Sequence, residues 1–329
     1  MVEDYGDPKK EYDAVRGECG ALDLRELGTL RAVGRDRVRY LHNMLSNDIK
    51  ALKPGTGCYA TLLTRQGQIQ SDLHVYAFAE ELLLECPVAG TQPLLENLNR
   101  FIVGDVVTIE NLTDTLCILS LQGPLAREKM EVTVESPLAG MAALDHRTFE
   151  RSSGAWIVAR RDRTGCDGYD LWLPREDAPV VWSQWVSAGI RAVGHTALNW
   201  LRTEAGIPWY GVDMTDRNLP MEMGLDKAIS MTKGCYRGQE IVARVIHRGH
   251  LDRKLAGVAV ESAEVPAAGA EVRADDTRIG TVTSAILSPR LGRPLALCIL
   301  KTAYLQAGTR VEVAWGNANC SAQVVALPL

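Results

Sequence analysis

The pattern of predicted secondary structure changes at the stretch Lys-Leu-Ala-Gly-Val-Ala-Val, residues 254–260. This stretch is the first of several short strand-like runs that Gly, Pro and Asp separate, and the others are Glu271 to Ala274, Ile279 to Ile286, Ala296 to Leu300, Val311 to Ala314 and Ser321 to Ala326. Apolar residues do not recur at helical spacing in this region. Many short strands at such spacing predict a small barrel or sandwich. We therefore expect a domain boundary near residue 250 and a β-barrel domain over 251–329.

The region before this boundary, residues 1–250, mixes strands and helices. The pattern predicts strands over 27–33, 58–63, 68–78, 82–88, 105–110, 115–121, 155–160 and 168–173. Apolar residues at helical spacing predict helices after Gly34 and over 91–102, 178–188 and 196–205. Strands and helices do not alternate strictly, so the pattern favours an α+β arrangement of mostly antiparallel sheets.

Composition narrows the class of protein. The 329 residues are 46% hydrophobic and 23% charged, which is ordinary globular usage and excludes a mainly disordered or fibrous chain. The formal charge of −5 argues against a general nucleic-acid binder, and direct RNA binding is not expected. The acidic N-terminus does not resemble a secretory signal, and no apolar run approaches the roughly 20 residues of a membrane span. We expect a soluble, cytoplasmic protein without membrane contact.

The most unusual segment runs from Lys233 to Arg244 and reads Lys-Gly-Cys-Tyr-Arg-Gly-Gln-Glu-Ile-Val-Ala-Arg. Two glycines flank a Cys-Tyr-Arg triplet, which indicates a tight turn, and nearby cations favour the reactive thiolate of Cys235. Between Lys233 and Lys254 the chain carries a local charge of +4, from six basic residues against Glu240 and Asp252. Two readings stay open: a solvated basic loop with an ordinary cysteine, or a functional thiol beside an anion-binding patch.

The sequence does not support a metal site. The eight cysteines are scattered without paired spacing, which is unlike a disulfide scaffold or a zinc site. His247 and His250 follow Cys235, but no fourth ligand is evident and the region is cationic. The motifs of P-loop nucleotide hydrolases, dinucleotide-binding dehydrogenases, serine hydrolases and zinc proteases are also missing from the sequence. We therefore predict no metal, and those four classes lose support.

Charged residues elsewhere in the chain can be interpreted either as ordinary surface groups or as parts of a functional site. Asp72 lies on the polar face of its strand between Gln70 and His74, where it is either solvated or, if that face lines a cleft, an acid, base or hydrogen-bond acceptor. Arg202 and Glu204 lie on a helix that ends at Gly206. Residues two apart on a helix do not face each other, so these two would serve different partners.

The segment Lys233 to Arg244 resembles the signature of the YgfZ family, the folate-binding relatives of the glycine-cleavage T-protein (GcvT, aminomethyltransferase). The matching signature positions are Lys233, Gly234, Cys235, Tyr236, Gly238, Gln239, Glu240 and Arg244. Further matches occur in order over nearly the whole chain, at 41–55, 58–73, 121–124, 164–169, 201–206 and 279–292. Two positions depart from the T-protein pattern, because Ser71 stands where T-proteins carry a first aspartate and Cys166 stands where they carry glutamate.

The resemblance implies a three-lobed fold, with two ferredoxin-like α+β lobes over 1–250 that bind folate and a C-terminal small β-barrel. It implies tetrahydrofolate or a derivative as cofactor. The positions that match the expected pocket are Tyr59, Asp72, Tyr169, Arg202 and Glu204. Tyr59 and Tyr169 would stack on the pterin, Asp72 would accept a hydrogen bond from a ring nitrogen, and Arg202 would meet a carboxylate.

The function that this resemblance implies is that of an accessory protein in the assembly or repair of iron–sulfur proteins, with links to tRNA modification and one-carbon metabolism. Its partners would be iron–sulfur client or assembly proteins, and Cys235 would be its functional thiol. The alternative is an aminomethyltransferase that moves a one-carbon unit from a lipoyl-bound donor to tetrahydrofolate, against which Ser71 and Cys166 count. A third hypothesis is an RNA- or protein-docking module that uses the basic stretch 233–254.

Overall fold

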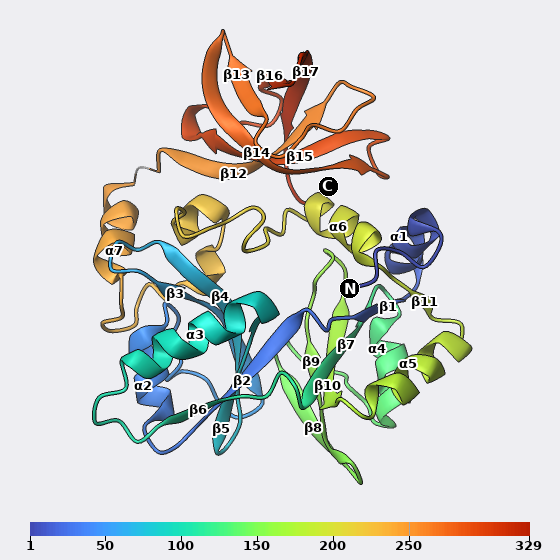
Figure 1. The fold of residues 1–329 in the computed structure, drawn as a ribbon, viewed down its shortest axis with the longest axis vertical. Helices are drawn as coiled ribbons and strands as arrows, with labels where there is room; N and C mark the ends of the chain where they lie inside the picture. The colour runs from blue at the N-terminus through green and yellow to red at the C-terminus, as the bar shows by residue number, and fades with distance from the viewer. Residues whose placement is uncertain (250) are drawn as a thin grey trace. The chain divides into compact units, whose positions relative to one another are not determined.

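The computed structural model describes residues 1–249 and 251–329, without the side chains of residues 246–248. The chain divides into two compact units (Figure 1). The first unit comprises Met1–Thr64, Gln70–Ala197 and Lys227–Arg237, and the second comprises Arg65–Ile69, Leu198–Asp226 and Gly238–Leu329. Helix α6 (His195–Glu204) begins in the first unit and continues in the second. None of the helices in the described residues is long and apolar enough to cross a membrane.

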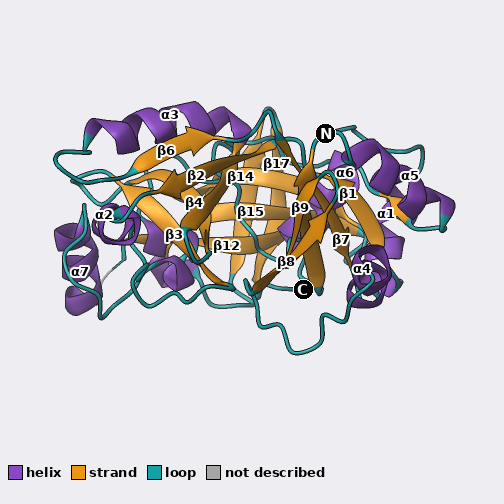
Figure 2. Cartoon of the chain, turned by 90° about the horizontal axis from the view of Figure 1, so that it is seen from below, coloured by secondary structure: helices purple, strands orange, loops and turns teal. Residues whose placement is uncertain are grey.

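The first unit contains a five-stranded sheet in the order β3-β4-β5-β2-β6. Its strands are β2 (Leu27–Val33), β3 (Thr56–Leu63), β4 (Ile69–Ala77), β5 (Glu81–Pro87) and β6 (Thr108–Asn111). The helices that pack against it are α2 (Arg37–Met44) and α3 (Val88–Arg100), and α3 lies across the strands in both ribbon views (Figures 1 and 2). Leu73 and Val75 of β4 join the core beneath these helices, so the intervening residues of this strand face the other way.

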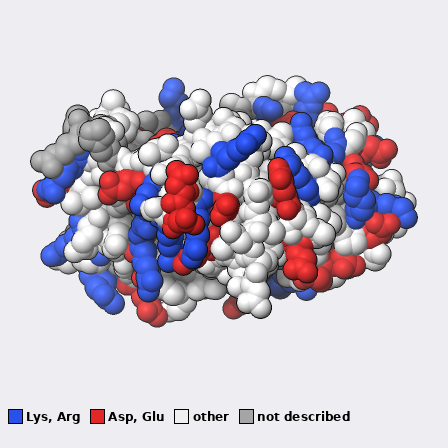
Figure 3. All heavy atoms as spheres, turned by 90° about the horizontal axis from the view of Figure 1, so that it is seen from above, with Lys and Arg blue, Asp and Glu red and all other residues white. Residues whose placement is uncertain are grey.

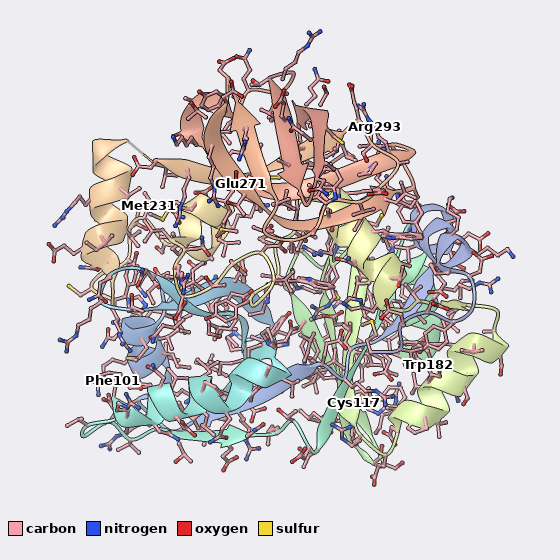
Figure 4. All side chains as sticks on the ribbon, turned by 45° about the horizontal axis from the view of Figure 1, so that its top comes forward. Phe101, Cys117, Trp182, Met231, Glu271 and Arg293 are labelled. Atoms are coloured by element: carbon pink, nitrogen blue, oxygen red, sulfur yellow. The ribbon has the colours of Figure 1, made fainter. Side chains whose placement is uncertain are left out.

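A six-stranded sheet in the order β11-β1-β7-β10-β9-β8 completes the first unit. Its strands are β1 (Gly20–Asp23), β7 (Leu116–Gln122), β8 (His146–Arg151), β9 (Gly154–Arg160), β10 (Gly168–Pro174) and β11 (Arg191–Ala192). Its helices are α1 (Pro8–Gly17), α4 (Ala126–Val134) and α5 (Ala178–Ser187). Figure 4 places Cys117 on β7 and Trp182 on α5, and both contribute to the core of this lobe. The pairings are antiparallel except for β1 with β11, as expected from the sequence.

The second unit is built around a closed barrel in the order β12-β15-β14-β13-β16-β17. Its strands are β12 (Arg253–Val260), β13 (Glu271–Ala274), β14 (Thr277–Ser288), β15 (Arg293–Lys301), β16 (Arg310–Trp315) and β17 (Ala318–Val325). Small and β-branched residues fill its interior, among them Val258, Val272, Ala296 and Val313. Gly280 allows β14 to approach β15, because a Cβ there would overlap the Ile299 carbonyl oxygen. Outside the barrel lie α7 (Gln239–Arg248), η1 (Pro220–Met223), η2 (Asp226–Ala228, which crosses into the first unit) and η3 (Thr302–Tyr304).

The fold class predicted from the sequence is confirmed, with mixed α/β lobes and a C-terminal six-stranded β-barrel. The exact boundary near residue 250 stays a prediction. Several elements escaped the sequence pattern: α1, α4 and β8. Helix α3 also begins at Val88 rather than Thr91, and the backbone turns directly from β5 into it at Pro87.

Candidate functional site

The candidate site begins with two side chains on neighbouring strands of the five-stranded sheet. The hydroxyl of Tyr59 on β3 donates a hydrogen bond of 2.8 Å to Oδ2 of Asp72 on β4. Because side chains alternate along a strand, His74 emerges on the same face as Asp72. Its imidazole stacks on the Tyr59 ring, with centroids 4.4 Å apart and planes inclined by 9°. The stack holds the phenol in the orientation that reaches Asp72.

The second oxygen of Asp72 lacks a partner. Its Oδ1 is buried and makes no hydrogen bond within the described part of the chain. Burial raises the pKa of Asp72, and the hydrogen bond from Tyr59 opposes that rise. An unsatisfied buried acceptor is unfavourable in a folded protein. The carboxyl is therefore set up to take a hydrogen bond from a group that is not part of this chain.

A buried ion triplet lies beside this pair. Arg163, in the loop between β9 and β10, donates to Asp170 Oδ2 at 2.6 Å and to Glu85 Oε2 at 2.8 Å. The residues Glu85 and Asp170 are 3% and 0% exposed. Burial lowers the pKa of Arg163, but the two carboxylates outweigh this effect and raise it. Since Glu85 is on β5 and Asp170 is on β10, the triplet joins the two sheets of the first unit.

Two further buried atoms near the triplet also lack partners among the described residues. They are the hydroxyl of Tyr76 on β4 and Nε of Arg161. The pKa of Tyr76 is raised well above its usual value, first by burial and then by Glu85. Burial and then the charges of Arg161 and Arg163 hold the pKa of His74 well below its usual value, so its imidazole is neutral at pH 7.

We refer to these residues together as the polar cluster. Its members are Tyr59, Asp72, His74, Tyr76, Glu85, Arg161, Arg163 and Asp170. It combines aromatic faces with hydrogen-bond donors and acceptors that the described residues do not satisfy. Such a mixture suits a flat heterocycle with polar edges, which needs apolar surface and a few well-placed polar groups.

Tyr169, expected to stack on the pterin, does not join the polar cluster. Adjacent strand residues point to opposite faces, and Asp170 points to Arg163, so Tyr169 faces the other way. Tyr169 is 2% exposed and packs in the core of the six-stranded lobe with Met130 of α4. The residue of this strand that reaches the polar cluster is Asp170, and the strand alternation itself could have identified it.

Arg202 and Glu204 have partners of their own inside the second unit. The Arg202 guanidinium is 1% exposed, forms an ion pair with Asp213 and lies 4.5 Å from the centroid of the Trp209 ring. Glu204 Oε1 accepts a hydrogen bond of 2.5 Å from the Ser288 hydroxyl. The guanidinium expected to meet a ligand carboxylate is therefore already engaged by a carboxylate of the chain, so we do not assign that role to Arg202.

The cations of the signature segment serve the fold rather than the thiol. Lys233 donates to the carbonyls of His42, in the last turn of α2, and of Leu45 and Asn47, which follow the helix. Burial lowers the pKa of Lys233 to about 8. Lys233 Nζ also lies 4.9 Å from the centroid of the Tyr236 ring. The expectation that Lys233 activates the neighbouring thiol overlooked these three acceptors, which hold its ammonium.

Those of the remaining basic residues in the stretch 233–254 whose side chains the structure describes have partners as well. Arg237 donates to Asn97 at 2.9 Å and lies over the ring of Phe101, which Figure 4 labels at the end of α3. Other ion pairs within the second unit are Arg244 with Glu240, Arg253 with Glu222 and Lys254 with Asp226. Cys235 is an exposed free thiol, and Gly234 precedes it. Gly238 has backbone angles in the left-handed region and is the N-cap of α7, which begins at Gln239.

This pairing weakens the hypothesis of a docking module on the basic stretch, because few of its charges remain for a partner. The face drawn in Figure 3 likewise shows basic and acidic side chains interspersed. The side chain of His247 and the whole of His250 lie outside the described residues. In the described part of the chain no group of three or more His, Cys, Asp or Glu side chains is arranged to hold a metal ion.

Comparison with known proteins identifies the family. Residues 5–233 match the model of the GCVT N-terminal domain, and residues 253–329 match that of the glycine cleavage T-protein C-terminal barrel domain. The chain is 30% identical over 326 residues to an aminomethyltransferase from Halalkalibacterium halodurans. The aligned region covers 97% of this chain and 89% of that relative. The chain is 31% identical over 323 residues to an aminomethyltransferase from Listeria monocytogenes, with the same coverage of both chains.

A solved structure confirms the fold. The crystal structure of glycine cleavage system aminomethyltransferase T from Bartonella henselae superposes with a TM-score of 0.90 and covers 99% of this chain and 90% of that one. The two sequences are 24% identical. This similarity supports the three-lobed architecture that the resemblance implied.

These findings correct the expected function. The relatives that match over nearly the whole chain are named aminomethyltransferase, so the expected role as an accessory protein for iron–sulfur proteins, with a functional thiol at Cys235, is wrong. The expected iron–sulfur partners and the link to tRNA modification have no support in the comparisons. The expected cofactor is confirmed at the level of the family, since aminomethyltransferases of this type use tetrahydrofolate. The chain belongs to the glycine-cleavage T-protein family, with both the N-terminal domain and the C-terminal barrel domain.

Proposed function

We propose that this protein is a tetrahydrofolate-dependent aminomethyltransferase that binds the pterin ring at the polar cluster. The observation that carries the proposal is the unsatisfied Oδ1 of Asp72, buried beside the Tyr59–His74 stack. A buried acceptor of this kind matches a ring N–H donor. When bound, tetrahydrofolate would supply the nitrogen atoms that accept a one-carbon unit.

The chain's own residues divide the work in the following way. Tyr59 fixes one oxygen of Asp72 by donating to it, which leaves the other oxygen for the ligand. The raised pKa of Asp72 brings its proton affinity closer to neutral pH, where an acid–base group is most effective. The Arg163 triplet holds β5 and β10 in place around this face. Neutral His74 stacks without adding charge next to Asp72.

The finer relationship to the YgfZ branch rests on the signature Lys233 to Arg244 and remains a proposal about ancestry. The departures at Ser71 and Cys166 fit such a branch. They do not touch the Tyr59–Asp72 pair, so folate binding is expected on either branch.

Two measurements test the proposal. The first is a calorimetric titration of tetrahydrofolate into the full chain, into Asp72→Asn and into the matched control Asp216→Asn, whose side chain is exposed. We expect saturable binding that weakens at least tenfold only in Asp72→Asn, because a hydrogen bond to a charged acceptor contributes about 1.5–3 kcal/mol. Equal binding by all three proteins would exclude the polar cluster as the pterin site.

The second measurement follows the release of ammonia from an aminomethyl-lipoyl donor with tetrahydrofolate present. Turnover that depends on tetrahydrofolate and falls in Asp72→Asn supports the transferase. Binding without turnover would keep the folate site and reject the transfer reaction. The two results therefore separate the cofactor from the chemistry.

A further inference from the structure

A cavity lies on the opposite face of the six-stranded sheet from the polar cluster. It has a volume of about 150 Å³ and lies wholly within the first unit, at the beginning of α4. The polar residues that line it are Arg127, Arg160, Asp167 and Tyr169. The remainder of its wall is Pro124, Leu138, Gly140 and Met141. Nothing in the proposed transfer reaction uses these residues.

The hydroxyl of Tyr169 is the first sign that the cavity receives a ligand. Tyr169 is 2% exposed, and its hydroxyl makes no hydrogen bond with the residues that the structure describes. The hydroxyl is not among the fully buried atoms without a partner, so it is the part of the side chain that opens onto the cavity. Burial and then Asp167 raise the pKa of Tyr169, while Arg160 and Arg127 lower it, and all three charged side chains line the same cavity as the phenol. The hydroxyl therefore remains a neutral donor at pH 7, inside a polar cavity.

The arginines supply further donors. Arg160 uses Nε for Asp167 Oδ1 at 2.9 Å and Nη1 for the Met141 carbonyl at 2.8 Å, and no bond of its Nη2 occurs among the described residues. Arg127 makes no hydrogen bond or ion pair within the described chain, and it is the second residue of α4. The N–H groups of a first helical turn lack partners within the helix and favour negative charge. No side chain caps this turn at Leu125.

The charges around the cavity select a monoanion. Arg160 is neutralised by Asp167, and Glu131, which also acts on Tyr169, is held by the N–H of Leu138 at 2.7 Å. Arg127 is therefore the cation of this group without an ion pair among the described residues. The two arginines and the two carboxylates together carry no net charge, so a second negative charge on the ligand would be repelled. A planar carboxylate matches the fork of an arginine and one hydroxyl donor. The volume of the cavity accommodates a small organic acid.

We propose that this cavity binds a small monocarboxylate, held by Arg127, Arg160 and Tyr169. The site is separate from the pterin site, because Tyr169 and Asp170 point to opposite faces of β10. Its occupant would pack against α4 and the strand that also carries Asp170 of the ion triplet.

The test is a calorimetric titration of sodium acetate and, separately, of inorganic phosphate into the full chain at constant ionic strength. The variants are Tyr169→Phe, which removes only the hydroxyl, and Arg127→Ala, an exposed position whose loss does not disturb the core. Lys129→Ala on the same helix is the control, because Lys129 does not line the cavity. We expect saturable acetate binding that weakens about tenfold or more in Arg127→Ala and roughly threefold to tenfold in Tyr169→Phe, with the control unchanged.

Several results would overturn the proposal. One is the lack of saturable acetate binding in the unchanged chain, and another is an equal loss in Lys129→Ala, which would indicate a general charge effect. Tighter binding of phosphate than of acetate would refute the selection of a monoanion. Tetrahydrofolate affinity measured on Arg127→Ala should be unchanged, and its loss would make the cavity part of the folate site. Because tetrahydrofolate binding and acetate binding are measured separately, a failure of the carboxylate site can be told apart from a failure of the proposed function.

Discussion

Replacing Arg163 with methionine tests the ion triplet most directly. The change removes the guanidinium and keeps an apolar stem. Glu85 and Asp170, which are 3% and 0% exposed, then lose the cation that both of them bind. Removing one partner of a buried ion pair destabilises a protein by about 3–5 kcal/mol. We expect a loss in this range at pH 7 in Arg163→Met.

Urea unfolding followed by tryptophan fluorescence measures this effect. Trp172 lies 5.0 Å from the Tyr76 ring, centroid to centroid, and so reports on the neighbourhood of the triplet. The companion variant Arg163→Met/Glu85→Leu/Asp170→Leu removes all three charges and should recover most of the lost stability, since replacing a buried ionic network by apolar residues of similar volume is often nearly neutral in effect. A loss below about 1 kcal/mol in Arg163→Met, or no recovery in the companion, would refute the assignment of the triplet as a buried, mutually dependent group.

Three further changes have definite expected outcomes. The pKa of His74 in the folded chain is well below its usual 6.5, so below pH 6.5 the unfolded chain binds a proton that the folded chain does not, and the free energy of unfolding should fall by up to about 1.4 kcal/mol per pH unit. In His74→Phe, urea unfolding measured from pH 7 to pH 5 should show a smaller decrease. An unchanged decrease would contradict the burial of the imidazole. Lys233→Met removes three hydrogen bonds to carbonyls and should destabilise by roughly 2–4 kcal/mol, whereas the exposed control Lys227→Met should change little in the same urea assay. Asp213→Asn leaves the buried Arg202 without its carboxylate and should lower stability by about 3–5 kcal/mol; a thermal midpoint equal to that of the unchanged chain would show that the pair is dispensable.

Local pattern was enough to predict the strands but not the partners of their side chains. The alternation along β4 correctly predicted that Asp72 and His74 share a polar face, because a period of two is a property of the strand itself. Arg163 and Glu85 are 78 positions apart, and only the packing of two sheets brings them together. No spacing rule indicates such a contact.

The same limit explains the two site residues that the structure relocates. Arg202 was expected to meet a ligand carboxylate because its position matches the pocket that the resemblance implies, yet Asp213 meets it from the following loop. Tyr169 was chosen for its aromatic ring, although the neighbouring Asp170 has the orientation that reaches the polar cluster. Residue type indicated a chemistry in both cases, and the backbone path decided whether that chemistry was available.

The unsatisfied atoms of the polar cluster restrict what its ligand can be. Asp72 Oδ1 requires a donor, Arg161 Nε requires an acceptor, and the Tyr76 hydroxyl can meet either. Each buried group without a partner is unfavourable by about 1–3 kcal/mol, so a ligand that satisfies only one kind would leave part of this energy unrecovered. A purely anionic ligand has no donor for Asp72, and an apolar one satisfies none of the three. A pterin presents N–H donors and a carbonyl acceptor along its edges, so the ring, rather than the glutamate tail, should account for most of the affinity at this cluster.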